Sequence, residues 1–224
     1  MPSVALQTVS ISGAEVVLLP SGAAFLPGER TLLVADAHFG KALSFRRLGV
    51  PVPEATTGQT LATLTDAIAT TGALRIVFLG DFLHAARSQA DSLLDTLREW
   101  RRDHAALALT LVRGNHDDRA GDPPADLGIE VVDEPLPSGP FALQHHPDPR
   151  PGAYVLAGHW HPCARLHGRG HERLRLPCFW LAAGVGILPA FGAFTGMHPI
   201  ARGEGDRVFV IADDAVRELP PGVG

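Results

Sequence analysis

Three apolar runs of strand length, joined by helix-like stretches, constrain the fold of this chain more than any other feature. The runs cover residues 31–35, 74–79 and 106–112, and amphipathic helical patterns over 57–70 and 89–104 connect them. Continuous apolar strands are typical of a sheet that is covered on both faces. Because these strands alternate with helices, the sequence predicts an α/β fold with a mainly parallel sheet.

Shorter strand patterns, broken by Gly and Pro, fill the rest of the chain. Strands are expected over residues 14–19, 129–133, 141–144, 154–157, 174–182 and 207–212, the last two antiparallel, and a short helix over 43–48. A connection over 135–140 and a glycine-rich loop over 184–196 link some of them. We expect residues 1–224 to form a single domain, with a short flexible tail from about residue 220.

Charge and cysteine content limit the function classes. The formal net charge is −5 with neutral histidines, which argues against a broad basic surface, so any contact with phosphates must be local. Cys163 and Cys178 lack a metal-ligand spacing and are expected to be free thiols in a reducing compartment. The sequence has neither a signal-peptide pattern nor an apolar run of membrane-spanning length, so we expect a cytoplasmic protein without a membrane contact.

Potential metal ligands follow five of the expected strands. One Asp or His at a strand end is more often a helix cap or a packed side chain, but five such ends in succession favour a shared site. In Asp36-Ala37-His38 and in His159-Trp160-His161 the two outer side chains share one face of an extended segment, so each pair can point into one pocket. The candidate ligands are Asp36, His38, Asp81, Asn115, His145, His159 and His161.

The chemistry of these ligands indicates the kind of ion. Imidazole mixed with carboxylate and amide oxygen suits first-row divalent ions such as Mn²⁺, Fe²⁺ or Zn²⁺. Seven candidate ligands exceed what one tetrahedral ion needs. The economical arrangement is two divalent ions that share a carboxylate, spaced about 3.5–4 Å apart as in two-metal hydrolases.

Taken in order along the chain, these motifs resemble those of the calcineurin-like metallophosphoesterases. The resemblance implies two facing mixed β-sheets flanked by helices, a four-layer sandwich. It also implies that one ion is held by Asp36, His38, Asp81 and His161, and the other by Asp81, Asn115, His145 and His159. The matching motifs are Asp36-Ala37-His38, Gly80-Asp81, Gly114-Asn115-His116-Asp117, His145 and Gly158-His159-Trp160-His161.

One ligand is ambiguous, because His145 and His146 are adjacent and the sequence alone leaves open which of them binds metal. We select His145, because in the family the ligand follows directly on its strand and precedes a sharp turn. His146 would then lie at the mouth of the pocket, in contact with substrate or with solvent.

The resemblance also implies a reaction, the hydrolysis of a phosphoric ester by a hydroxide held between the two ions. His116 would not bind metal. It would donate a hydrogen bond to the phosphate or a proton to the leaving oxygen. Asp117 would orient His116 or cap a helix. His116 and Asp117 are therefore the candidate catalytic residues.

Longer segments around the motifs, residues 33–41, 78–84, 113–119 and 188–196, resemble one bacterial branch of the family, the ligase-associated metallophosphoesterases. This resemblance implies a manganese-dependent DNA endonuclease or phosphodiesterase in DNA repair, with Fe²⁺ and Zn²⁺ as alternative ions. Its substrate would be single-stranded or end-containing DNA, and it would be functionally associated with a DNA ligase, a helicase and an exonuclease. The candidate substrate contacts are Lys41, His84, Arg119 and His146.

Three aromatic residues also have expected positions or roles. Phe191 and Phe194 could stack a base or pack in the core, and Trp160 is expected to point into the sheet.

Two other function classes remain as alternatives. A small-molecule phosphodiesterase or phosphatase would use the same metal site. A non-catalytic scaffold would use the same fold, but the complete set of ligands argues against that class.

Overall fold

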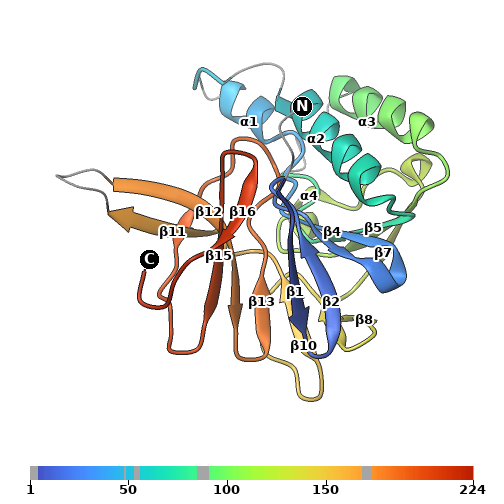
Figure 1. Cartoon of the computed structure of the whole chain (residues 1–224). Helices are drawn as coiled ribbons and strands as arrows, with labels where there is room; N and C mark the ends of the chain where they lie inside the picture. Colours follow the sequence, from blue (N-terminus) through green and yellow to red (C-terminus); the bar gives the residue numbers. More distant parts are fainter. Residues whose placement is uncertain (1–4, 48, 53–55, 85–90, 168–172, 224) are drawn as a thin grey trace.

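Two mixed β-sheets pack face to face in the computed structural model, which describes residues 5–47, 49–52, 56–84, 91–167 and 173–223 (Figure 1). The first sheet consists, in spatial and chain order, of β1 (Gln7–Ile11), β2 (Ala14–Leu18), β3 (Ala24–Leu26), β4 (Thr31–Ala35), β5 (Arg75–Leu79), β6 (Ala108–Val112) and β7 (Ile129–Val132). Neighbours from β1 to β4 are antiparallel, and neighbours from β4 to β7 are parallel. The predicted parallel sheet is therefore confirmed as one half of a larger mixed sheet.

The second sheet is built from the C-terminal part of the chain. Its strands are β8 (Leu136–Ser138), β9 (Phe141–Leu143), β10 (Tyr154–Ala157), β11 (Pro162–His167), β12 (Arg173–Ala182), β13 (Val185–Ile187), β14 (His198–Pro199), β15 (Arg207–Ala212) and β16 (Ala215–Glu218). They lie in the order β14-β11-β12-β13-β10-β9-β8, with β15 on β12 and β16 on β15. β10 is parallel to both β9 and β13, whereas β12 and β15 are antiparallel, as predicted.

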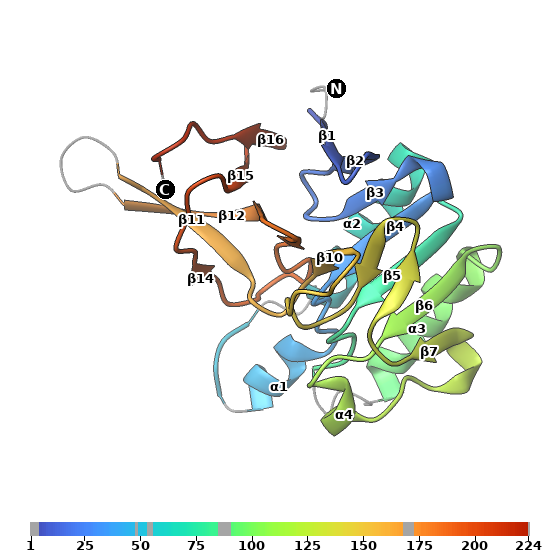
Figure 2. The ribbon, with the colours of Figure 1, turned by 90° about the horizontal axis from the view of Figure 1, so that it is seen from below.

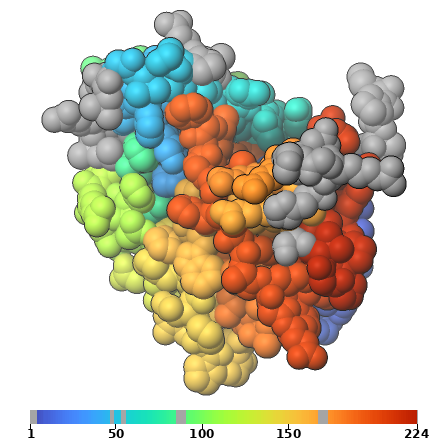
Figure 3. All heavy atoms as spheres, turned by 90° about the vertical axis from the view of Figure 1, so that its left-hand side faces the viewer, coloured from blue at the N-terminus to red at the C-terminus, as the bar shows by residue number. Residues whose placement is uncertain are grey.

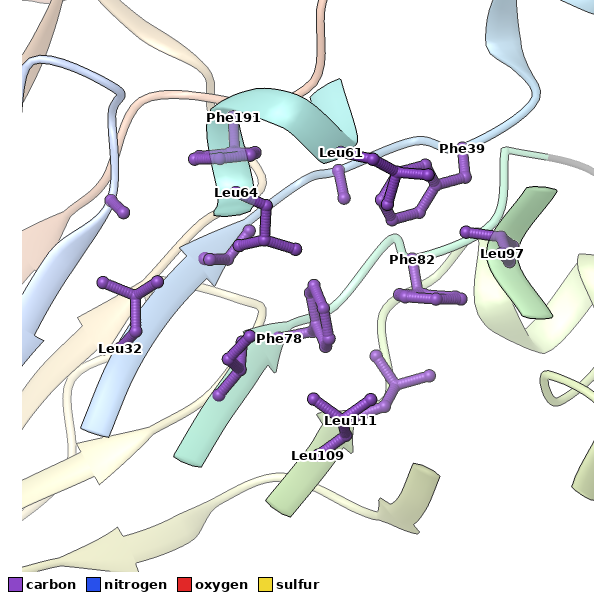
Figure 4. Close-up of a cluster of buried hydrophobic side chains, with 14 of the residues drawn as sticks. Leu32, Phe39, Leu61, Leu64, Phe78, Phe82, Leu97, Leu109, Leu111 and Phe191 are labelled. Atoms are coloured by element: carbon purple, nitrogen blue, oxygen red, sulfur yellow. The ribbon is translucent and has the colours of Figure 1, made fainter. Parts of the chain in front are cut away.

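The helices are α1 (Lys41–Arg47), α2 (Thr56–Thr71), α3 (Asp91–Asp103) and the single turn α4 (Asp117–Ala120), with short 3₁₀ turns at Pro27–Glu29 and Ala125–Leu127. Side chains of α2 and α3 pack on the first sheet, where Figure 4 shows Leu64 near Phe78 and Leu97 beside Phe82. The predicted fold class, two facing mixed sheets flanked by helices, is confirmed. Among the described residues, none of the helices has both the length and the apolar character that a membrane crossing needs.

Strand β4 is buried on both faces because it contributes to two separate cores. Leu32 and Val34 belong to the core under the helices, while Leu33 and Ala35 belong to the core between the sheets. This alternation follows from the two-residue period of a strand. The continuous apolar run in the sequence thus has the structural reason that was expected, two apolar faces instead of one.

Several short elements were not predicted. The stretch 135–140, expected to be a simple connection between strands, contains β8, and the expected glycine-rich loop over 184–196 contains β13. Strands of three residues carry too little periodic pattern to be recognised in a sequence. Residues 129–133 and 141–144 were expected to be joined as successive strands, but β7 and β9 lie in different sheets. The predicted helix start at residue 89, and residue 48 at the end of the short helix, lie outside the described residues.

The parallel strands of the first sheet end together, since Ala35 pairs with Leu79 and Leu79 pairs with Val112. Figure 2 shows α1 and α4, which follow β4 and β6, on the same side of the molecule. Figure 3, which views the left-hand side of Figure 1, shows blue, green, yellow and orange segments on one face, so parts far apart in the sequence come together there. The carboxyl ends of neighbouring parallel strands are the usual place for a site in such sheets.

Candidate metal centre

All seven predicted ligands gather at this edge, and both sheets contribute to them. Asp36, Asp81 and Asn115 follow β4, β5 and β6 of the first sheet. His145 follows β9, and His159 and His161 follow β10 of the second sheet. Among the described residues, four groups of side chains have ligand atoms within 4.8 Å of one another: Asp36–His38–His161, Asp36–Asp81–His145, His145–His146–His159 and His38–His84–His116.

His145 is the centre of one half of the cluster. Its Nε2 atom lies 3.0 Å from Asn115 Oδ1, 2.9 Å from His159 Nδ1 and 3.5 Å from Asp81 Oδ1. Its Nδ1 atom lies 3.0 Å from the carbonyl oxygen of Leu79. Because a carbonyl oxygen only accepts hydrogen bonds, Nδ1 carries the proton and Nε2 presents its lone pair to the other ligands. Such an outer hydrogen bond is what fixes a metal-binding imidazole.

Asp36, His38 and His161 form the other half. Asp36 Oδ1 lies 3.4 Å from His161 Nε2, and Asp81 Oδ2 lies 3.7 Å from His38 Nε2. Asp81 therefore faces His38 with one carboxylate oxygen and His145 with the other. Asp81 thus lies between the two halves of the cluster.

Unsatisfied polar atoms provide a test of whether metal ions fit here. Among the described residues, the buried atom Asp36 Oδ1, which lies 3.4 Å from His161 Nε2, has no hydrogen-bond partner, although Asp36 Oδ2 accepts a hydrogen bond of 2.8 Å from the amide of His159. Burial, aided by the charge of Lys41, lowers the pKa of His38 to about 2, so the ring is neutral, as a ligand must be. Buried lone pairs that converge without protons between them are unfavourable unless a cation lies among them. The residues present thus fit divalent metal ions.

The backbone at the ligands has an uncommon conformation. Five of the seven ligand residues have positive φ angles: 53° at Asp36, 46° at His38, 52° at Asp81, 70° at His159 and 47° at His161. Each such residue costs of the order of 1–3 kcal/mol, and residues of this kind cluster at functional sites. These angles also correct the argument that each Asp-x-His or His-x-His pair lies on an extended segment. The paired side chains meet because the backbone turns sharply, not because it alternates like a strand.

Glycines let the strand ends approach each other closely. A Cβ atom on Gly114 would lie 2.5 Å from Asp81 Oδ1, and one on Gly158 would lie 2.5 Å from Asp36 Oδ2. Gly80, with φ +77°, is tighter still, since its Cβ would lie 2.2 Å from His145 Nδ1. Real Cβ atoms do not come this close, so the glycines in the motifs are required by packing as well as by conformation.

We predict that Gly80→Ala displaces the His145 ring and lowers metal affinity by about 10–100-fold, the usual effect of disturbing the support of a ligand. Bound metal is measured by elemental analysis and unfolding by calorimetry. Gly13→Ala is the matched control, because Gly13 has a similar φ of +81° but a Cβ there meets nothing within 4 Å. If both variants bind metal like the wild type, close packing at Gly80 does not support the site.

His116 stands beside the cluster and faces it with one nitrogen. Its Nδ1 lies 2.9 Å from the carbonyl oxygen of His84, and its Nε2 lies 3.9 Å from Asp81 Oδ2. The His116 ring stacks on that of His84 with centroids 5.3 Å apart, and its side chain is 32% exposed. Since the His84 carbonyl takes the proton on Nδ1, Nε2 is the atom that is turned toward the centre and toward solvent.

Comparison with solved structures decides the family. A nuclease of Pseudomonas putida called MPE superposes with a TM-score of 0.85 at 43% sequence identity, over 96% of this chain and all of that one. This chain belongs to the calcineurin-like metallophosphoesterases. Within that family it falls in the ligase-associated nuclease branch, and it is a metal-dependent phosphoester hydrolase.

The other comparisons add little. The E. coli phosphoesterase YfcE aligns with a TM-score of 0.40 and 14% identity, over 84% of this chain and 97% of that one. A scan against models of protein families gives no match, and a comparison with curated proteins gives none either.

Asp117 does not orient His116 in this metallophosphoesterase. One of its carboxylate oxygens accepts hydrogen bonds from the amides of Phe82 and Leu83, and the other accepts one from the amide of Gly114. The expected capping role is also wrong, because Asp117 is the first residue of α4 and His116 precedes the helix. Burial raises the pKa of Asp117 to about 6. Asp117 thus ties the turn after β5 to the turn after β6, and the His84 carbonyl is the group that orients His116.

The predicted substrate contacts of this metallophosphoesterase lie at different distances from the centre. His84 and Lys41 line it, since His84 lies 5.4 Å from His38 between ring centroids, and Asp36 and Asp81 act electrostatically on Lys41. Burial lowers the pKa of both groups, that of His84 to about 4. Arg119 is exposed, and no contact joins its side chain to the cluster within the described part of the chain.

His146 lies next to the cluster, and a residue that the sequence analysis missed holds it there. Glu134 accepts hydrogen bonds from the amides of His145 and His146 and from the His146 ring, at 2.9, 3.1 and 2.9 Å. Burial alone would raise the pKa of Glu134, but these hydrogen bonds outweigh it and the pKa is lowered. The position of Glu134 in the sequence could have identified it. Glu134 follows β7, the parallel strand next to β6, just as Asp36, Asp81 and Asn115 follow β4, β5 and β6.

Aromatic residues divide between the core and the surface. Phe191 is part of the core under the helices, whereas Phe194 is 46% exposed and packs on Phe45 with ring centroids 5.6 Å apart. Trp160 was expected to point into the sheet, but it is 46% exposed. The positive φ angles of its neighbours, His159 and His161, are the physical reason, because they interrupt the alternation that the expectation assumed.

Proposed function

We propose that this metallophosphoesterase is a nuclease that hydrolyses phosphodiester bonds in DNA with the help of two divalent ions, most readily Mn²⁺. The observation that carries the proposal is the position of Asp81, whose two carboxylate oxygens face His145 and His38. Two ligand groups that share one carboxylate are the arrangement of two-metal phosphodiester hydrolases. The likeness to a nuclease over nearly the whole chain supports the same class of substrate.

In this proposal the two ligand groups divide as the sequence implied. Asp36, His38, Asp81 and His161 would hold one ion, and Asp81, Asn115, His145 and His159 would hold the other. When bound, such ions supply Lewis-acid stabilisation of the phosphate and acidify water.

The chain's own groups complete the proposed site. His116 Nε2 is turned toward Asp81. In the imidazolium form, Nδ1–H keeps its hydrogen bond to the His84 carbonyl and Nε2 carries the second proton, which it can donate to the leaving oxygen of the cleaved strand. Lys41 adds a positive charge beside Asp36 and Asp81, where a phosphate would approach. His146, held by Glu134, offers its other ring nitrogen at the margin of the cluster.

Accessibility favours a polymer as the substrate. Asp36 and His145 are buried, whereas His116 and His146 at the margin of the cluster have side chains that are 32% and 36% exposed. The partly exposed margin fits a substrate that lies across the surface. The resemblance to the ligase-associated branch further supports action in DNA repair together with a DNA ligase, a helicase and an exonuclease.

Cleavage of end-labelled nucleic acids tests the proposal. Metal-free protein is assayed with added Mn²⁺, Fe²⁺ or Zn²⁺ on single-stranded DNA, duplex DNA, RNA of the same sequence, a cyclic nucleotide and a phosphopeptide. We expect cleavage of DNA that requires an added ion, is fastest with Mn²⁺ and is absent from Asp81→Asn. Hydrolysis of the cyclic nucleotide or phosphopeptide with no DNA cleavage under any ion would overturn the nuclease assignment in favour of a small-molecule phosphodiesterase or a phosphatase.

A further inference from the structure

A second binding feature lies next to the metal centre, on the side of the second sheet. It is a hollow of about 610 Å³ lined by His159, Trp160, Pro162, Trp180, His198 and Pro199, among others. This volume is within the usual range for small-ligand sites. His159 also belongs to the cluster of candidate ligands, so the hollow and the metal centre share a wall.

Two tryptophans form the aromatic surface of the hollow. Their ring centroids are 5.7 Å apart with an angle of 35° between the planes. Trp180 is fixed, because its Nε1 donates a hydrogen bond of 2.7 Å to Asp206 Oδ2. Trp160 is 46% exposed, although an indole is among the most favourable side chains to bury. An exposed ring beside a fixed one provides a free π face.

The backbone around Trp160 is held in place on both sides. The Trp160 amide donates to the carbonyl of Gly158, and the His198 amide donates to the carbonyl of His161, at 2.8 and 2.9 Å. β14, which carries His198, pairs with β11 immediately beyond this turn. The position of the Trp160 ring relative to the metal centre is therefore defined before any ligand arrives.

We propose that Trp160, supported by Trp180, binds an unpaired nucleobase next to the phosphate that is cleaved, and so selects single-stranded nucleic acid. The proposal rests on the proposed nuclease function. Trp160 is covalently flanked by His159 and His161, so a strand whose phosphate lies among the ligands has an adjoining base within reach of the indole. A base in a duplex already stacks on its neighbours, and only an unpaired base has a face free for the indole. Stacking on an aromatic side chain accepts every base, which suits a nuclease without sequence preference.

The test compares an oligothymidylate with an oligomer of the same length whose sugars are all tetrahydrofuran abasic residues. In the wild type, kcat/KM for the base-bearing strand exceeds that for the abasic strand by about tenfold or more, from the usual strength of base stacking. In Trp160→Ala this ratio falls toward one through a higher KM, and Trp160→Phe retains most of it. Leu174→Ala is the matched control, because Leu174 is an apolar side chain outside the hollow with a similar exposure, 54% against 46%, and we expect it to keep the wild-type ratio.

Each outcome has a distinct meaning. Thermal unfolding of the variants verifies that an exposed side chain was removed without loss of the fold. If the wild type cleaves DNA and Trp160→Ala keeps the wild-type ratio, the base-binding role is overturned while the nuclease assignment stands. If the wild type cleaves no nucleic acid, both are overturned.

Discussion

We expect Asp81→Asn to abolish measurable phosphodiester hydrolysis and to reduce the amount of bound metal. Asp81 is buried, and its carboxylate faces His145 and His38 while accepting a hydrogen bond of 3.0 Å from the His116 amide. Asparagine has the same shape and its carbonyl oxygen can keep that hydrogen bond, but it brings no charge and only one acceptor oxygen. The two ligand groups then lose the anion they share. We expect turnover to fall by at least about a thousandfold, since metal ions contribute several kcal/mol of charge stabilisation.

The measurements for this variant are metal content, thermal unfolding and hydrolysis of labelled DNA. Asp95→Asn is the matched control, because Asp95 is an exposed carboxylate of α3 that pairs with Arg98 outside the cluster. It should keep both metal and activity. An Asp81→Asn protein that retains a full complement of metal and a tenth of wild-type turnover would show that this carboxylate is not shared by the two halves.

We expect His116→Ala to have the second largest effect on turnover and to leave metal binding intact. The His116 ring nitrogen nearest the cluster is 3.9 Å from Asp81, and its other nitrogen is held by the His84 carbonyl. The ring lies outside the groups that contain Asp36, Asp81 or His145, and forms a separate group with His38 and His84. Loss of a positioned proton donor costs about 10²–10⁴-fold in rate, and we expect a fall of that size in kcat.

His104→Ala is the control for a lost imidazole, since His104 stacks on Trp100 beyond the end of α3 and takes no part in the ligand groups. Elemental analysis and single-turnover cleavage of DNA distinguish the two roles of His116. Loss of metal from His116→Ala would make it a ligand, and near wild-type turnover would remove it from the reaction.

Much of the site was predictable from the sequence, because one rule determines where the ligands lie. Asp36, Asp81 and Asn115 follow neighbouring parallel strands, whose ends share an edge of the sheet. To apply this rule to a sequence, one needs only to recognise the apolar runs that form the parallel strands. It would also have found Glu134 after β7, had it been applied to the fourth strand of the row.

The errors have a physical cause in the backbone between the strands. Trp160 was placed by strand alternation, but the flanking residues, with φ of 70° and 47°, interrupt that alternation. Asp117 was judged from its position next to His116, whereas its partners are amides brought close by folding, such as that of Phe82. Strands as short as β13 depend on pairing with neighbours, which local sequence does not encode.

The origin of the ligands from both sheets gives the metal centre a mechanical role. Asp36, Asp81 and Asn115 belong to one sheet and His145, His159 and His161 to the other, so ions bound among them would clamp the two halves of the sandwich together at one edge. Ions that bind only the folded state add about 2.7 kcal/mol of stability at a hundred times their dissociation constant. The spacing between the sheets, set by core residues such as Leu79 and Leu143, is then part of the coordination geometry. Substitutions deep in that core would tune metal affinity without touching a ligand.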